Sequence, residues 1–240
     1  MAEWDGPGGP SLPKFTIVYI PFRKKYTFRG ENMDFTDPAV DQYLYSLLPA
    51  RDNVLQEMEA LAKERKIPII GPVVARILYQ LVRLAKAKTI FELGSAIGYS
   101  TIWITRAAGE GATVYYSDSD PDKARQAEQF FIRAGVRDRI RILQGNALDL
   151  LDQTPGTFDV IFNDVDKQYY PQVFHKAVPR IRKGGLFLAD NVLWYGRVTQ
   201  PPEDDATRGI VEFNRLIYSS PDLYPSILPV RDGLAVCEKL

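Results

Sequence analysis

The stretch Ile90-Phe91-Glu92-Leu93-Gly94-Ser95-Ala96-Ile97-Gly98-Tyr99-Ser100 decides the fold of this chain. It begins as a short apolar run typical of a buried strand, and helical apolar spacing starts near Ser100. Gly94 and Gly98 indicate a tight loop between the two elements. The first N–H groups of such a helix are unpaired and face the crevice beyond the strand, where doubly wound sheets bind ligands. We therefore expect a ligand site at this loop.

The rest of the chain alternates strand and helix patterns around this loop. Helical patterns predict a cap ahead of the sheet at residues 37–48, 51–65 and 71–85. Further strands are expected at 112–118, 139–144, 158–164 and 185–190, and helices at 121–134, 170–182 and 206–218. Asp232-Gly233, a turn dipeptide between apolar runs, predicts a closing hairpin of strands 224–229 and 234–239. The pattern predicts a doubly wound, Rossmann-like α/β fold with seven strands, mostly parallel, a C-terminal antiparallel hairpin and an N-terminal helical cap.

Composition excludes several classes of protein. The chain has 240 residues, 45% hydrophobic and 25% charged, which fits one large globular domain at 37–240 after a partly flexible extension at 1–36, whose residues 1–13 are Gly- and Pro-rich. The formal net charge is zero, so any nucleic-acid binding needs a local patch. A single cysteine, Cys237, excludes an internal disulfide. Because no apolar run has membrane-spanning length and no secretory signal is recognised, we expect a cytoplasmic protein that does not enter a membrane.

The glycine spacing and the next acid select the ligand. A dinucleotide fingerprint requires G-x-G-x-x-G, and Ser95-Ala96 replaces its middle, which disfavours a dehydrogenase. The pattern Glu92-x-Gly94-x-x-x-Gly98, followed by Asp118 after the next strand, resembles instead the S-adenosylmethionine (SAM) loop of class I methyltransferases. In that family the loop holds the methionine end of SAM and the acid binds the ribose hydroxyls. Without Asp118, the two glycines are also explained by a tight connection that binds no ligand.

Oxygen-bearing side chains follow two later strands. Asp164, Asp190 and Asn191 are expected at the same edge of the sheet as the glycine loop. Two carboxylates and an amide oxygen suit a hard octahedral cation such as Mg²⁺, with positions left for water or substrate. The absence of a cysteine cluster and the single histidine argue against zinc. Strand-end aspartates also cap helices and form turns, so the residues alone leave both interpretations open.

Two longer motifs carry a family resemblance. Asp164-Val-Asp-Lys167 and Asp190-Asn-Val-Leu-Trp194-Tyr-Gly196-Arg-Val198 resemble the paired motifs of the cation-dependent O-methyltransferases, the caffeoyl-CoA and catechol O-methyltransferase family. The similarity runs from about Lys66 to Leu240. It implies a cation, Mg²⁺ or alternatively Mn²⁺ or Ca²⁺, bound by Asp164, Asp190 and Asn191. It also implies that Lys167 lies beside the reacting hydroxyl, either as the base or as a stabiliser of the phenolate. The SAM-binding residues implied are Glu92, Gly94, Ser95, Gly98, Ser100, Asp118, Asn146, Ala147 and Asp164.

The expected activity is metal-dependent methyl transfer from SAM to a hydroxyl of a catechol-like or caffeoyl-type small molecule, with Trp194 as a candidate wall for the aromatic ring. The alternative is O-methylation of a modified tRNA base at the same site, supported by the basic and aromatic segment 22–29. A non-catalytic SAM-binding protein is disfavoured by the presence of all four residues of the expected metal and lysine site.

Other expectations concern assembly and departures from the family. A homodimer is expected from the resemblance and from aromatic and apolar residues near the start of the chain, Tyr43, Tyr45, Leu47 and Leu48. The segment 1–36 has no recognised counterpart. Asn146 stands where many class I methyltransferases have an acid near adenine, and Asn163 replaces a commonly apolar residue before the first metal ligand.

Overall fold

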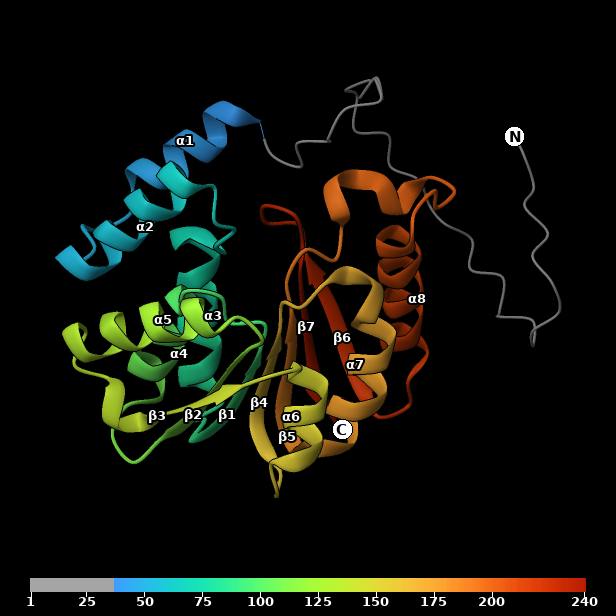
Figure 1. Ribbon diagram of the computed structural model, residues 1–240. Coiled ribbons are helices and arrows are strands. Elements are labelled where there is room, and N and C mark those ends of the chain that lie inside the picture. The colour runs from blue at the N-terminus through green and yellow to red at the C-terminus, as the bar shows by residue number, and fades with distance from the viewer. Residues whose placement is uncertain (1–36) are drawn as a thin grey trace, which may run out of the picture. The chain divides into compact units, whose positions relative to one another are not determined.

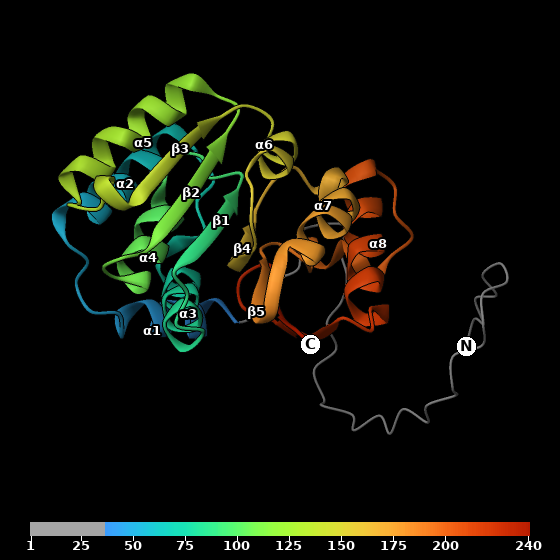
Figure 2. The ribbon, with the colours of Figure 1, turned by 90° about the horizontal axis from the view of Figure 1, so that it is seen from below.

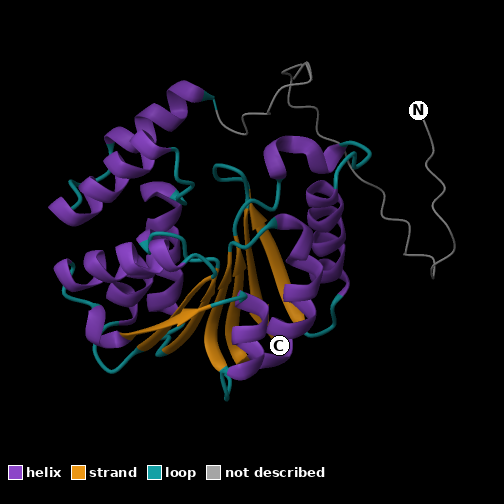
Figure 3. Ribbon diagram, viewed as in Figure 1, coloured by secondary structure: helices purple, strands orange, loops and turns teal. Residues whose placement is uncertain are grey.

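The computed structural model describes residues 37–240, and a seven-stranded sheet runs through this part of the chain (Figures 1 and 3). The predictions for residues 1–36, including the basic and aromatic segment at 22–29, lie outside the described residues. The strands are β1 (Thr89–Leu93), β2 (Thr113–Asp118), β3 (Ile140–Gln144), β4 (Phe158–Asn163), β5 (Ile181–Ala189), β6 (Leu223–Leu228) and β7 (Leu234–Lys239).

The strand order is β3-β2-β1-β4-β5-β7-β6, and it confirms the predicted fold class. Strands β1 to β5 are parallel, whereas β7 is antiparallel to both β5 and β6. The chain moves outward from β1 through β2 to β3 and then crosses back to β4 on the other side of β1. The carboxyl ends of β1 and β4 therefore flank the topological switch point, which is where open α/β sheets bind ligands.

Helices cover both faces of the sheet (Figure 2). One face packs against α2 (Asn53–Arg65), α3 (Gly71–Leu84), α4 (Tyr99–Ala108) and α5 (Pro121–Arg133). The other packs against α6 (Ala147–Gln153), α7 (Tyr170–Ala177) and α8 (Asp205–Ser219). Helix α1 (Pro38–Ser46) precedes these and buries none of its residues. No helix among residues 37–240 is long and apolar enough to cross a membrane.

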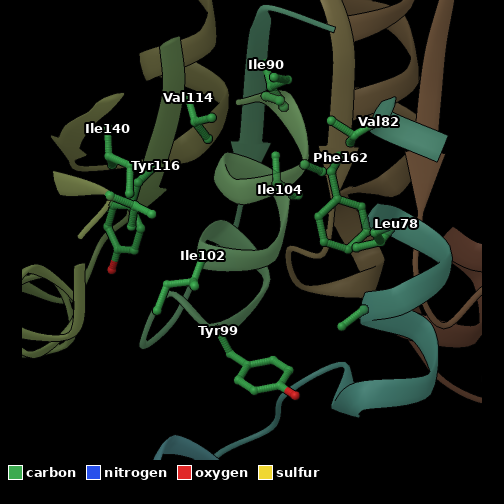
Figure 4. Packing of buried hydrophobic residues seen from close by; sticks show 14 of the residues in the cluster. Leu78, Val82, Ile90, Tyr99, Ile102, Ile104, Val114, Tyr116, Ile140 and Phe162 are labelled. Atoms are coloured by element: carbon green, nitrogen blue, oxygen red, sulfur yellow. The ribbon is translucent and has the colours of Figure 1, made fainter. Parts of the chain in front are cut away.

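Each face of the sheet has its own apolar core. On the first face, Leu78 and Val82 of α3 are fully buried in the same core cluster as Ile90 of β1 and Phe162 of β4 (Figure 4). Burying one such side chain contributes about 1.5–3 kcal/mol. On the second face the ring of Phe213 lies edge-on to those of Tyr170 and Phe187, with centroid separations of 5.2 and 5.8 Å. Because both faces are packed, the strand ends that carry the functional residues are held firmly.

Two predicted boundaries are wrong, and a helix was missed. The helix expected at 170–182 ends at Ala177, and a short 3-10 turn with Pro179 follows it. The missing N–H and fixed φ of this proline disfavour a continuing helix. Strand β5 then begins at Ile181, before Gly184-Gly185, where the pairing with β4 shifts register. These glycines form an irregularity within the strand rather than its start. Helix α6 was not predicted.

Candidate active site

The glycine loop is held in place by strand β2. The Ala96 amide donates to Asp118 Oδ2 (2.9 Å), and the Ala96 carbonyl accepts from the Tyr116 hydroxyl (2.6 Å). Asp118 Oδ1 accepts from the amide of Asp120 (2.9 Å). Asp118 is only partly buried and thus stands at the open end of β2, as expected for a ribose ligand, but it also fixes the loop.

The two glycines are required by the packing of the chain itself. A Cβ at Gly94 would lie 2.6 Å from the carbonyl oxygen of Asp164, so the ends of β1 and β4 could not come together. At Gly98, which has φ +82° and caps α4, a Cβ would lie 2.4 Å from the Phe131 ring. Close backbone approach is therefore real at both positions, and at Gly94 it brings the SAM loop next to the predicted metal ligand.

The helical cap is tied to the same loop. Tyr99, which follows Gly98, donates its hydroxyl hydrogen to Glu59 Oε1 of α2 (2.7 Å), and Arg51 donates to both oxygens of that carboxylate (2.9 Å from Nε to Oε1). A cavity of about 470 Å³ lies beside this contact, and none of the predicted site residues lines it. Its lining residues are Ala50, Arg51, Gln56, Glu59, Ala60 and Lys63.

Glu92 is a buried carboxylic acid beneath the loop. Its Oε2 accepts from the Thr101 hydroxyl, its backbone carbonyl accepts from the Ser95 hydroxyl (3.5 Å), and Oε1 is buried without a hydrogen-bond partner. Burial raises the pKa of Glu92 to about 7, because the charged form loses its hydration. Ser95 and Ser100 are themselves buried, so these three predicted SAM residues are brought together at the loop.

Asn146 and Ala147 lie where the chain leaves β3 and enters α6. The Asn146 side-chain oxygen accepts from the amides of Leu148 (2.9 Å) and Asp149 (3.3 Å), which makes Asn146 the N-cap of α6. This capping explains why an asparagine suits the position, and the pattern Asn-Ala-Leu-Asp would have predicted the missed helix. Gly145 is joined to the end of β2 by its amide, which donates to the Asp118 carbonyl (3.0 Å).

The predicted metal ligands stand at the ends of β4 and β5. Asp190 is 2% exposed and its Oδ1 is buried without a hydrogen-bond partner, while its Oδ2 accepts from Asn191 Nδ2 (3.3 Å). The two aspartates interact electrostatically. Burial raises the pKa of both Asp164 and Asp190, and the charge of Asp164 raises that of Asp190 further. Within residues 37–240 no group of three His, Cys, Asp or Glu side chains is placed to bind a metal.

Lys167 contacts the first of these carboxylates. Its Nζ donates to Asp164 Oδ1 (2.8 Å) and to the Val165 carbonyl (3.1 Å). The same ammonium lies 5.5 Å from the centroid of the Tyr170 ring and 5.9 Å from that of Trp194. Two of its three donor positions are therefore occupied, and aromatic rings flank it.

Sequence reasoning missed Asp232 as part of this region. It was read only as half of a turn dipeptide, yet it is 5% exposed and its Oδ1 accepts from the amide of Tyr195, beside Trp194. The next residue back, Arg231, acts electrostatically on Asp164, Asp190 and Asp232. No local pattern shows that the turn before β7 meets the loop after β5.

The fold and the strand-end residues define a Rossmann-like methyltransferase. The sequence model of the O-methyltransferase family matches residues 50–240, so the chain belongs to that family. It is 33% identical over 210 residues to a catechol O-methyltransferase of Niastella koreensis, covering 82% of this chain and 95% of that protein. A caffeoyl-CoA O-methyltransferase of Populus kitakamiensis is 29% identical, with 84% and 94% covered.

Solved structures agree with this assignment. The O-methyltransferase of Bacillus cereus in complex with S-adenosylhomocysteine superposes with a TM-score of 0.78 at 31% identity, covering 84% of this chain and 97% of that one. The O-methyltransferase TomG of Streptomyces achromogenes, involved in tomaymycin synthesis and solved with SAM, gives 0.77 at 27% identity, with 84% and 96% covered. The chain is thus a SAM-dependent O-methyltransferase, as predicted.

Replacement of Asp118 by alanine is expected to weaken SAM binding by about 1–3 kcal/mol, because it removes the carboxylate that is predicted to accept a charge-assisted hydrogen bond from the ribose. Calorimetric titration measures the change. Tyr116→Phe is the matched control, since it removes the other contact to Ala96 and leaves the carboxylate in place. Equal losses in the two variants would show that Asp118 acts only through the loop, and unchanged affinity in Asp118→Ala would contradict its assignment.

Proposed function

We propose that this enzyme transfers the methyl group of SAM to a hydroxyl oxygen of a catechol-like or caffeoyl-type small molecule, with the help of a divalent cation. The observation that carries the proposal is the meeting of Asp164, Asp190 and Asn191 with Lys167 at strand ends next to the SAM loop. The relatives named for catechol and caffeoyl-CoA methylation support the substrate class.

SAM is proposed to bind across residues 94–100. The buried carboxylate of Glu92, with one unpartnered oxygen, suits the cationic methionine end of SAM, and Asp118 suits the ribose. The adenine would lie near the turn at residues 145–147. We further propose that residues 37–240 form the single methyltransferase domain and that 1–36 is an extension to it.

The strand-end residues fit a divalent cation. A buried carboxylate oxygen without any donor, Asp190 Oδ1, is costly unless a ligand completes it. Two interacting carboxylates and an amide oxygen are a donor set for Mg²⁺, with Mn²⁺ or Ca²⁺ as alternatives. Asp164, Asp190 and Asn191 would hold the cation, which when bound supplies charge that favours the ionised form of a substrate hydroxyl.

The chain's own residues would position the substrate. Lys167 retains one free N–H position and is proposed to hold the substrate oxygen electrostatically, because Asp164 already holds its ammonium. Trp194, whose indole Nε1 is buried without a partner, is proposed as a wall for the aromatic ring. Glu92 and Asp118 would hold SAM, so that the substrate oxygen meets the methyl carbon of SAM in line.

Product analysis with labelled SAM tests the proposal. The purified enzyme is incubated with Mg²⁺ and either catechol-type compounds or total tRNA, and methylated products are identified by mass spectrometry. Methylated catechols support the proposal. Methyl transfer only to tRNA would establish the alternative, whose motivating segment lies outside the described residues, and transfer to neither would overturn the substrate class.

A homodimer is proposed through the cap. Helix α1 buries no residue, and Val40, Tyr43 and Leu47 are 46%, 61% and 59% exposed, an unusual apolar surface for a monomer. Light scattering at micromolar concentration should give twice the chain mass of 27.2 kDa. Tyr43→Glu should shift the population toward monomer, whereas Ile132→Glu, a comparable change at an exposed residue of α5, should not. A monomeric wild-type protein would contradict the proposal.

A further inference from the structure

The loop after β5 has an uncommon backbone conformation. Within residues 37–240, seven non-glycine residues have positive φ. Four of them belong to this loop or to the turn before β7: Asn191 (60°), Trp194 (46°), Tyr195 (54°) and Arg231 (51°). L-residues in this region cost conformational free energy and persist only where surrounding structure enforces them. The loop therefore needs an external support.

The turn before β7 supplies that support. The Leu193 amide donates to the Asp232 carbonyl (2.9 Å), and the Val192 amide donates to the Gly233 carbonyl (3.1 Å). A Cβ at Gly233 would lie 2.8 Å from the Leu193 nitrogen, so the two segments are in direct contact. The third bond comes from a side chain, because the Tyr195 amide donates to Asp232 Oδ1.

The acceptor of this third hydrogen bond is the Asp232 carboxylate, a group that is costly to bury. Asp232 is 5% exposed, its Oδ2 has no partner, and burial raises its pKa to about 6. An Asp-Gly turn does not require a buried carboxylate, since the aspartate of such a turn is ordinarily solvated. The position of the carboxylate is thus better explained by its hydrogen bond to the Tyr195 amide than by the stability of the hairpin.

The held loop carries the aromatic wall. The centroid of the Trp194 ring lies 5.9 Å from Lys167 Nζ and 5.9 Å from Arg197 Cζ. Tyr195 is the next residue, so a shift of its backbone moves the Trp194 ring relative to Lys167. The proposed SAM residues lie on other loops.

We propose that Asp232 is a positioning residue for methyl transfer, whose carboxylate fixes the Tyr195 backbone and thereby keeps Trp194 beside Lys167. The consequence for the substrate rests on the proposed function, whereas the dependence of the loop on Asp232 does not. Loss of the carboxylate is expected to weaken substrate binding and to leave SAM binding intact.

Hydrogen exchange measured by mass spectrometry tests the loop directly. In Asp232→Ala, amides of the peptide covering 192–199 should exchange about tenfold faster or more, because a hydrogen bond to a charged acceptor is lost. Asp232→Asn should stay close to wild type, since its side-chain carbonyl can still accept from Tyr195. Asp222→Asn is the matched control: this acid precedes β6, is 63% exposed and pairs with Lys239. Peptides of β1 and β4 should be unchanged in all variants.

Kinetics then tests the consequence. Asp232→Ala should raise the KM for a catechol about tenfold or more, with the Kd for SAM changed less than twofold, and Asp232→Asn should restore most of the loss. Unchanged exchange at 192–199, or equal weakening of SAM and substrate, would overturn the inference. If the wild type methylates no catechol, the proposed function fails, but hydrogen exchange still decides whether Asp232 anchors the loop at 192–199. If Asp232→Ala does not fold, the same measurements are made on Asp232→Ser. The serine hydroxyl oxygen lies one bond closer to the backbone than the carboxylate oxygens of aspartate.

Discussion

Chelation with EDTA should reduce methyl transfer to a catechol by about 10³-fold or more, while SAM binding is retained. Burial raises the pKa of both Asp164 and Asp190, and the charge of Asp164 raises that of Asp190 further, so a divalent ion is the simplest partner for the pair. Mg²⁺ or Mn²⁺ should restore activity. Apart from Asp164, the proposed SAM residues belong to other loops, and calorimetry in EDTA should therefore still show SAM binding.

The variant Asp190→Ala should lose activity to the same extent and should not recover at millimolar metal concentration. Titration with Mn²⁺, followed by electron paramagnetic resonance, should show weakened binding. Asp166→Ala is the matched control: it removes an exposed carboxylate two residues from Asp164 and should keep metal-dependent activity. Full turnover in chelator would refute the cation assignment and leave Lys167 as a metal-free base.

The second large effect is expected at Glu92, where replacement by glutamine should stabilise the SAM-free protein at pH 8. Burial raises the pKa of Glu92 from 4.5 to about 7, so the folded protein keeps a proton that the unfolded chain has lost. Stability therefore falls as the pH rises through this window, by about 3 kcal/mol in total. Glutamine has no proton to lose. The difference in unfolding free energy between Glu92→Gln and wild type should thus grow between pH 5 and pH 8.

Urea unfolding at pH 5, 6, 7 and 8 measures this difference, and Glu110→Gln, at an exposed glutamate after α4, controls for the loss of one charge. The same substitution should weaken SAM binding, because the ionised Glu92 is proposed to face the cationic methionine end. In the wild type, SAM affinity should fall as the pH drops below about 7. A stability difference that is constant with pH would show that Glu92 does not titrate in this window.

Much of the site could be predicted because parallel strands bring their carboxyl ends to one edge. Glu92, Asp164 and Asp190 each follow or end an apolar run, so the topology alone places them near one another. The two glycines were predicted to form a tight loop, and the structure shows that they pack against the Asp164 backbone and the Phe131 ring. The same residues thus serve packing and the site together.

Other features depend on contacts between distant segments. The Asp232 carboxylate meets the Tyr195 amide across 37 residues, and no periodicity encodes that meeting. The boundary near Pro179 was misjudged because the glycine pair at 184–185 looks like a turn until the neighbouring strand is in place. Asn146 was judged only by a family position, although its own capping chemistry was readable from the three residues that follow it.

The place of β7 has a consequence for biosynthesis. This strand pairs with β5 on one side and β6 on the other, so residues 234–239 close the middle of one half of the sheet. A nascent chain that has emerged only as far as β6 leaves the edge of β5 open and gives β6 no neighbour. During translation the ribosome-bound chain is therefore expected to present an unpaired apolar strand edge to chaperones, and the pairing of β7 is the step that commits the domain to its folded state.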